Sequence, residues 1–296
     1  MAVSNLYLVR HESNTGLSDV IDNFLDYKRR SLSKNSTRAY IQNLNYLKEH
    51  CKSLTDINRQ HLNTILNQSG SVRTKALRKA VIDNFIEWCV KEEILAKKIE
   101  TEIYTTRMEK HQHSILTISE NELRVLLAGV DDGHIRDVLL VGFYMGLRIS
   151  ELVHCRPAWI VKDGLFLRIG DLRIWELADE FHPKSQKEHD DPIAIPPQVR
   201  RVFDRNTGLP QYSRMFGYSS ESTLRLHLKN TFQALPAPLC NHFTAHHLRH
   251  SCISYWLNEK RVSVQEVQRM ARHSRMDTTM RYHHPSDDAH LAAFSC

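Results

Sequence analysis

The chain has 296 residues, enough for two domains with separate hydrophobic cores. Its 40 Lys and Arg against 34 Asp and Glu give a formal net charge of +6, which is compatible with a nucleic-acid partner and equally with an ordinary basic protein. No apolar run is long enough to span a membrane, and residues 1–16 lack the apolar segment of a signal peptide, so we expect a cytoplasmic protein with no membrane partner.

Cysteine and histidine usage argues against disulfides and metal. Several of the six cysteines lie in apolar helical patterns and none has C-x-x-C spacing, which indicates buried thiols in a reducing compartment. These are Cys51, Cys89, Cys155, Cys240, Cys252 and Cys296. Four histidines cluster at positions 242, 246, 247 and 250, but no Cys or carboxylate stands at ligand spacing from them, so we expect neither a metal nor another cofactor.

The N-terminal third of the chain is predicted to be helical. Residues 1–16 are polar without a clear period and are interpreted as a tail. Apolar stripes then predict helices that begin near Leu17, Ser36, Asp56 and Val72, which together form a four-helix domain over residues 17–95. The residues of the fourth helix expected to face its core are Leu77, Val81, Phe85, Ile86 and Cys89.

Positive charge lies off these stripes and at the start of the fourth helix. A helix with such charge can lie against phosphates or in a major groove, although an ordinary solvated face explains it about equally well. The candidate DNA contacts are Arg38, Lys48, Arg73, Lys75, Arg78 and Lys79.

Residues 96–118 are polar and basic and are interpreted as a linker to a second domain over residues 119–285. Ser119 and Glu122 have the spacing of a capping box at the start of an apolar helix. Gly146 allows a tight turn, after which Arg148 is expected near a helix N-terminus, facing a phosphate. Glu151 is interpreted as a buried partner of arginine.

A small sheet is expected next. Residues 164–169 and 172–177 have the pattern of a hairpin with a turn at Gly170 and Asp171, and residues 193–195 form a third candidate strand. Lys184 and Lys187 lie between the second and third strands. Taken alone, either can be an ordinary surface lysine at the tip of a loop. Residues 198–243 return to helical patterns.

Residues 244–282 hold the densest group of functional side chains. His246, Arg249 and His250 share one helical face, and His273 is expected where the next helix ends. That helix starts with the S-x-x-E pattern of Ser263 and Glu266, and its buried side is expected to hold Val264, Val267 and Met270. Asp277 is predicted to cap a further short helix that carries Tyr282.

The chemistry of this group suits attack on a phosphodiester. Arg249 offers a planar fork of donors to two phosphate oxygens, and His246 and His273 can donate hydrogen bonds or transfer protons. Tyr282 can be the nucleophile that forms a phosphotyrosyl intermediate. Any one of these residues alone is more simply a surface or half-buried side chain, but the joint pattern favours a catalytic site.

The patterns T-x-H-x-L-R-H and H-S-x-x-x-T-T-x-x-Y, together with G-L-R-x-S-E-L at residues 146–152, resemble the signature of the tyrosine recombinases, which include phage integrases and Xer-like resolvases. The chain departs from the family pattern at one point. Ala271-Arg272 stands where Leu-Gly commonly precedes the histidine of the H-S motif, and the departure affects the local turn. The resemblance implies a catalytic set made of Arg148, Lys184, His246, Arg249, His273 and Tyr282, with Lys187 as the alternative hairpin lysine.

The resemblance implies a mainly α fold, in which a four-helix, SAM-like core-binding domain clamps DNA and precedes a catalytic domain with a small antiparallel sheet. It implies cleavage and rejoining of a double-stranded recombination site through a 3′-phosphotyrosyl intermediate, without ATP or metal, by a homotetramer associated with the nucleoid. A directionality factor is a further candidate partner. Residues 286–296 carry a short apolar patch that is expected to dock on a neighbouring subunit or in cis.

Three alternatives remain open. An Xer-like resolvase of chromosome dimers uses the same residues as the integrase of a phage or mobile element. A DNA-binding protein without strand exchange would keep these residues as remnants and form no covalent adduct. A type IB topoisomerase-like enzyme would relax DNA without synapsis.

Overall fold

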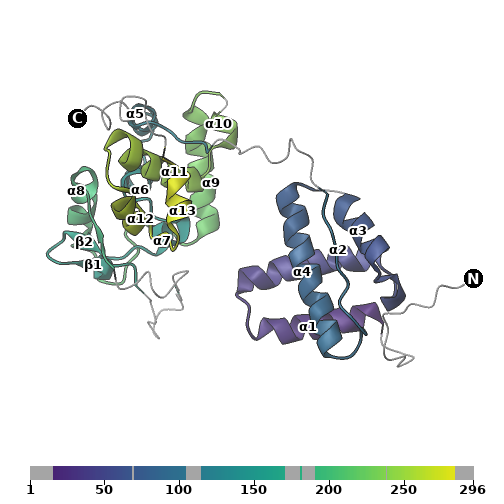
Figure 1. The fold of residues 1–296 in the computed structure, drawn as a ribbon. Coiled ribbons are helices and arrows are strands. Elements are labelled where there is room, and N and C mark those ends of the chain that lie inside the picture. Colours follow the sequence, from purple (N-terminus) through teal and green to yellow (C-terminus); the bar gives the residue numbers. More distant parts are fainter. Residues whose placement is uncertain are drawn as a thin grey trace, which may run out of the picture. The chain divides into compact units, whose positions relative to one another are not determined.

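The structure is a computed structural model that describes residues 16–68, 70–104, 115–170, 181, 191–237 and 239–283 (Figure 1). The chain divides into two compact units, Met1–His113 and Ser114–Cys296, which are described separately below. Several predictions concern residues outside the described ranges: the strand at residues 172–177, Lys184 and Lys187, Cys296, and the two terminal tails. Within the described ranges, no helix has the length and apolarity that a membrane span requires.

The first unit contains the four predicted helices, α1 (Leu17–Arg29), α2 (Lys34–His50), α3 (Arg59–Gln68) and α4 (Val72–Lys91), with a short 3-10 turn, η1 (Leu54–Asp56), before α3. Their apolar stripes meet in one core around Phe24, Leu44 and Phe85, all fully buried. Two starts differ from expectation: α2 begins at Lys34 because Ser33 is its N-cap, and α3 begins at Arg59 because η1 occupies residues 54–56.

The expectation that Leu77 faces the core was wrong. Leu77 is 49% exposed, whereas its neighbour Arg78 is buried. The Arg78 guanidinium lies 3.5 Å from the centroid of the Tyr46 ring, so a cation–π contact takes the place of the leucine at this end of the stripe. Val81, Phe85 and Cys89 are buried as predicted.

The second unit is mainly helical. Its α-helices are α5 (Glu120–Ala128), α6 (Gly133–Met145), α7 (Ile149–His154), α8 (Pro197–Asn206), α9 (Glu221–Thr231), α10 (Leu239–His242), α11 (Ala245–Ser254), α12 (Val264–Ala271) and α13 (Met276–Met280). Short 3-10 turns, η3 (Pro157–Trp159) and η5 (Phe232–Ala234), and one π-helical segment, η6 (Tyr255–Glu259), join them.

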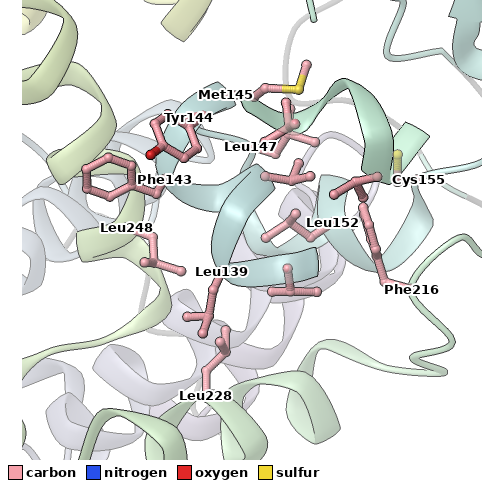
Figure 2. Close-up of a cluster of buried hydrophobic side chains, with 14 of the residues drawn as sticks. Leu139, Phe143, Tyr144, Met145, Leu147, Leu152, Cys155, Phe216, Leu228 and Leu248 are labelled. Atoms are coloured by element: carbon pink, nitrogen blue, oxygen red, sulfur yellow. The ribbon is translucent and has the colours of Figure 1, made fainter. Parts of the chain in front are cut away.

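Helix α6 lies at the centre of this unit and packs closely on α11. Leu139 and Phe143 of α6 point into a cluster that also holds Leu248 of α11 and Leu228 of α9 (Figure 2). A Cβ added at Gly142 would lie only 3.0 Å from Leu248 Cδ1, so the absence of a side chain lets the two helices approach. Because α11 carries residues 245–254, this contact positions the predicted catalytic face of that helix.

The small antiparallel sheet has the order β1 (Ile160–Val161), β2 (Phe166–Leu167), β3 (Ile193–Ala194). The second and third of these lie within predicted strands. The first was missed, because two residues directly after a 3-10 turn give no alternating pattern. The turn between β1 and β2 uses left-handed backbone at Lys162, Asp163 and Gly164. The turn predicted at Gly170 and Asp171 leads to a strand outside the described residues and stays a prediction.

Helix caps confirm two of the three predicted starts in this unit. Ser119 and Glu122 form a complete capping box, and Ser263 accepts a hydrogen bond from Glu266 N. The cap predicted for α13 was wrong, since Arg275 occupies the N-cap position. Asp277 lies within the first turn and pairs with Arg275 at 2.8 Å, where its negative charge still suits the helix N-terminus.

Candidate active site

The turn between α6 and α7 fixes the position of Arg148. Gly146 adopts left-handed backbone with φ 62°, and a Cβ there would lie 3.1 Å from Cys252 Sγ on α11. A glycine is therefore required, as the sequence predicted. Arg148 follows as the N-cap residue of α7, and Arg249 Nη1 of α11 donates to Gly146 O at 2.7 Å, which ties this turn to α11.

The carboxylate of Glu151 lies between two arginines and is only 2% exposed. Its Oε1 accepts from Arg148 Nη1 at 2.9 Å, and its Oε2 accepts from the Arg148 backbone N–H at 2.7 Å. Arg272 Nη2 donates to Oε2 from the other side. Burial alone would raise the pKa of Glu151, but the charges of Arg272, Arg148 and Arg249 outweigh it and hold the pKa below its ordinary value. The interpretation of Glu151 as a buried partner of arginine is confirmed.

Arg249 is as deeply buried as Glu151, and it donates to two main-chain carbonyls, Gly146 O and Ala271 O. Burial, followed by the charges of Arg272 and Arg148, lowers the pKa of Arg249 to about 9. Three guanidinium groups therefore act on one carboxylate, which accepts hydrogen bonds from Arg148 and Arg272 and feels the charge of Arg249. This excess of positive charge in a region of low dielectric favours binding of an anion.

Arg272 occupies the position at which the sequence departs from Leu-Gly. It is the C-cap of α12 with φ 53°, so it adopts the left-handed backbone that glycine favours and that an arginine adopts less easily. The turn is thus kept despite the substitution. The Arg272 side chain is 4% exposed and reaches Glu151, which offsets part of the backbone strain.

Tyr282 and three histidines surround the guanidinium groups. Tyr282 is 6% exposed, and its hydroxyl forms a hydrogen bond with Nδ1 of His250. The ring centroids of His250 and His246 lie 4.5 Å apart, and His273 Nδ1 lies 2.9 Å from Thr279 Oγ1. The Tyr282–His250 contact joins α11 to the segment that follows α13, and the His273–Thr279 contact joins the segment that follows α12 to α13.

The histidines are neutral at pH 7. Loss of hydration, followed by the charge of Arg249, lowers the pKa of His246 and lowers that of His273 to about 4. Burial raises the pKa of Tyr282, while the charges of Arg249 and Arg281 act in the opposite direction. In the DNA-free protein, therefore, the phenol keeps its proton and the imidazoles are uncharged.

Five residues of the predicted catalytic set thus lie in one electrostatically connected group: Arg148, His246, Arg249, His273 and Tyr282. The sixth, Lys184, and its alternative Lys187 lie outside the described residues. The predicted catalytic set omits Arg272 and His250, although His250 was expected on the same helical face as His246 and Arg249. Two features of the sequence indicated these residues: Arg272 stands where the family commonly has glycine, and His250 is the final histidine of the L-R-H pattern.

The candidate DNA contacts of the first unit differ in their surroundings. Arg38 and Arg73 are exposed and Lys75 is half-buried. Lys48 and Lys79 are engaged with carboxylates, Asp22 at 2.8 Å and Asp83 at 2.5 Å. The proposal for Arg78 needs correction, because its buried guanidinium stacks on Tyr46 and serves the core of its own unit.

Comparison with known proteins identifies the family. The model of the phage integrase family matches residues 109–289. The chain belongs to the phage integrase family. Two curated relatives extend the likeness along almost the whole chain. A tyrosine recombinase of Thermosipho africanus is 24% identical over 92% of this chain and 96% of its own length. Tyrosine recombinase XerC of Proteus mirabilis is 25% identical over 93% of this chain and 92% of its own length.

Solved structures share the fold. The Tn1549 transposon integrase in complex with transposon right end DNA has a TM-score of 0.68 at 14% identity and covers 94% of this chain and 98% of its own. A lambda integrase tetramer bound to a Holliday junction has a TM-score of 0.64 at 15% identity, and the match covers 93% of this chain and 80% of the lambda integrase chain. The predicted integrase fold is confirmed, and the chain is a tyrosine-type site-specific recombinase, an enzyme that transfers DNA strands.

The Arg272→Gly substitution tests how Arg272 contributes to stability. It removes one partner of the buried Glu151 and also relieves the left-handed backbone, so the free energy of unfolding should fall by about 2 kcal/mol, the net of an ion-pair loss and a smaller backbone gain. Urea denaturation measures the change. Arg261→Gly is the matched control, because Arg261 has φ 54° but is exposed. It should leave stability unchanged or raise it. Equal losses in both variants would mean that the Glu151 contact contributes nothing.

Glu151→Gln tests the charge of the carboxylate through pH. The folded-state pKa of Glu151 lies below the ordinary value of 4.5, so its stabilisation is fully present above about pH 4.5 and is lost as the pH falls towards the folded-state pKa. Wild type should therefore exceed Glu151→Gln in unfolding free energy by a constant amount near neutral pH, and by less in acid. Denaturation at a series of pH values gives this difference. A difference that does not vary with pH would show that the ionised carboxylate is not the stabilising form.

Proposed function

We propose that this recombinase cleaves and rejoins DNA through a 3′-phosphotyrosyl bond at Tyr282, and that it integrates and excises a phage or mobile element. The observation that carries the chemistry is the buried Tyr282 hydroxyl within electrostatic reach of Arg249, in a site where guanidinium groups outnumber carboxylates. A phosphodiester is an anion, and its charge would compensate that excess.

In the proposed reaction, Arg148 and Arg249 stabilise the charge that develops on the nonbridging oxygens of the scissile phosphate. The Tyr282 oxygen attacks phosphorus, the bond to the 5′-oxygen breaks, and Lys184 supplies the proton that this leaving oxygen needs. His246 and His273 hold the phosphate and assist proton transfer. A 5′-hydroxyl of a second strand then attacks the phosphotyrosine, so that the energy of the phosphodiester is retained.

The proposed DNA complex uses both parts of the chain. The helical domain at residues 17–95 clamps the duplex with Arg38, Arg73 and Lys75, with Lys48 and Lys79 available if their carboxylate partners release them. The linker at residues 96–118 leads to the catalytic domain at residues 119–285. We infer a homotetramer on paired sites, in the cytoplasm at the nucleoid. Its support is the lambda integrase structure, which is a tetramer bound to a Holliday junction.

The integrase assignment competes with an Xer-like role, which the likeness to XerC of Proteus mirabilis favours. The two roles use the same active site and differ in the DNA that is recombined. The DNA that flanks the gene separates them, because an adjacent attachment-like repeat supports an integrase and its absence supports dimer resolution. A directionality factor would be required only in the first case.

Tyr282→Phe tests the nucleophile. The variant should bind DNA as well as wild type and form no covalent adduct, since it lacks only the phenolic oxygen. Adducts trapped on a nicked duplex and resolved on a denaturing gel measure this. Persistence of the adduct would move the nucleophile elsewhere, for example to Tyr255. A wild-type enzyme that binds DNA and forms no adduct would support a binding protein without strand exchange.

Lys184→Ala tests the general acid. Cleavage should slow by about 10²–10⁴-fold, because the leaving 5′-oxygen is a strong base, while DNA binding should change little. A substrate with sulfur as the bridging 5′ atom needs no acid, so its single-turnover cleavage by Lys184→Ala should be close to normal. Cleavage by Arg249→Ala should remain slow with both substrates. Rescue of Lys187→Ala alone would assign the role to Lys187, and rescue of neither lysine variant would make His246 the next candidate.

A further inference from the structure

His250 is the side chain in contact with the Tyr282 hydroxyl, yet the six-residue catalytic set gives it no role. It follows Arg249 directly on α11, and its Nδ1 lies within hydrogen-bond distance of the phenolic oxygen. The two rings are tilted by 32° with their centroids 5.4 Å apart, so they are not stacked and the contact is through the polar atoms. An imidazole nitrogen placed at the oxygen of a nucleophile meets the geometric requirement for a proton acceptor.

The groups that face His250 are mostly basic. Three of them belong to α11: the rings of His246 and His247 contact His250, and the charge of Arg249 acts on it. The fourth, His273, follows α12. Burial is the largest cause that lowers the pKa of His250 to about 3, and the charges of these neighbours are the further causes. The imidazole is therefore neutral in the DNA-free protein, and a neutral imidazole has one nitrogen free to accept a proton.

We propose that His250 accepts the phenolic proton of Tyr282 during DNA cleavage and returns it during ligation. This inference rests on the proposed function, because it presupposes Tyr282 as the nucleophile. It names the acceptor of the proton from the attacking hydroxyl, for which the six-residue set offers only unspecified assistance by His246 and His273.

In cleavage the Tyr282 oxygen forms a bond to phosphorus and transfers its proton to His250 Nδ1, while the bond from phosphorus to the 5′-oxygen breaks and that oxygen takes a proton from the general acid. In ligation an incoming 5′-hydroxyl attacks phosphorus and gives its proton to the conjugate base of the general acid. The phosphotyrosyl bond breaks, and the imidazolium gives its proton back to the phenolate oxygen. No other reactant is required.

The same positive surroundings make the step depend on DNA. A positively charged His250 is disfavoured beside Arg249, so the free enzyme holds Tyr282 in its protonated, unreactive form. A scissile phosphate bound to Arg148 and Arg249 adds negative charge, which stabilises the imidazolium and brings its basicity closer to the range that suits general-base catalysis. The nucleophile is thus activated only where a phosphodiester is in place.

The contact could instead only position the phenol, and two substitutions separate these roles. His250→Asn keeps a short polar side chain that can hold a hydrogen bond to Tyr282 but cannot take up a proton at working pH. His250→Ala removes both functions and leaves space for added imidazole. His247→Gln is the control on the same helix. His247 Nδ1 accepts from Thr244 N at 2.8 Å, and a glutamine at this position of a capping box preserves that cap.

The experiment measures single-turnover formation of the covalent adduct on a nicked duplex that wild type cleaves, across a range of pH. His250→Ala and His250→Asn should both be slower by about 10²–10³-fold at pH 7, with DNA affinity unchanged. The deficit should shrink as the pH rises and solvent hydroxide replaces the base. Added imidazole should accelerate His250→Ala in proportion to its concentration, and His247→Gln should cleave at nearly the wild-type rate.

Three results would overturn the inference. A wild-type rate in His250→Asn would reduce His250 to a positioning residue. A deficit in His250→Ala that is constant with pH and insensitive to imidazole would indicate a structural effect. An unchanged rate in both variants would remove His250 from the reaction while leaving Tyr282 as the nucleophile. Absence of any Tyr282 adduct in wild type is a different outcome, since it would refute the proposed function itself.

Discussion

The buried carboxylate of Glu151 is the contact on which the site depends. It is the shared acceptor of Arg148, from the start of α7, and of Arg272, from the end of α12. These two helices are far apart in sequence, and a single anion holds their ends together. Removing one partner from such a group leaves an uncompensated buried charge, so each member constrains the others. Arg249 extends this arrangement, because it donates to Gly146 O at the end of α6 and to Ala271 O at the end of α12.

The arrangement also explains why the site would bind a phosphate. One carboxylate cannot compensate three guanidinium groups, and burial, followed by the charges that remain, lowers the pKa of Arg249 and of the surrounding histidines. The free protein therefore holds an unfavourable concentration of positive charge, which a bound phosphodiester would relieve. Burial and these charges keep the imidazoles neutral, so that proton acceptors are available beside Tyr282. Fold, electrostatics and the proposed chemistry thus follow from one set of contacts.

Much of this could be predicted from the sequence, because local patterns determine it. Helical periodicity placed the four helices of the first unit, Gly146 predicted the left-handed turn before Arg148, and Glu151 was recognised as a partner of arginine. The failures that affect the core and the site involve contacts between distant residues. Arg78 entered the core of the first unit in place of Leu77 because Tyr46, on another helix, offers it a ring. Arg272 appeared only as a departure from glycine, since its partner lies 121 positions earlier. No periodicity encodes such pairs.

If the Glu151 carboxylate holds the site together, Arg272 should act on the phosphate only indirectly, by positioning Arg148 through Glu151. A double-mutant cycle of Arg148→Gln and Arg272→Gly, with single-turnover adduct formation as the readout, tests it most directly. The account predicts that Arg272→Gly slows the wild-type enzyme but has little further effect once Arg148 is replaced, because the group it positions is gone. Losses that multiply in the double variant would show that Arg272 acts independently of Arg148 and would contradict the account.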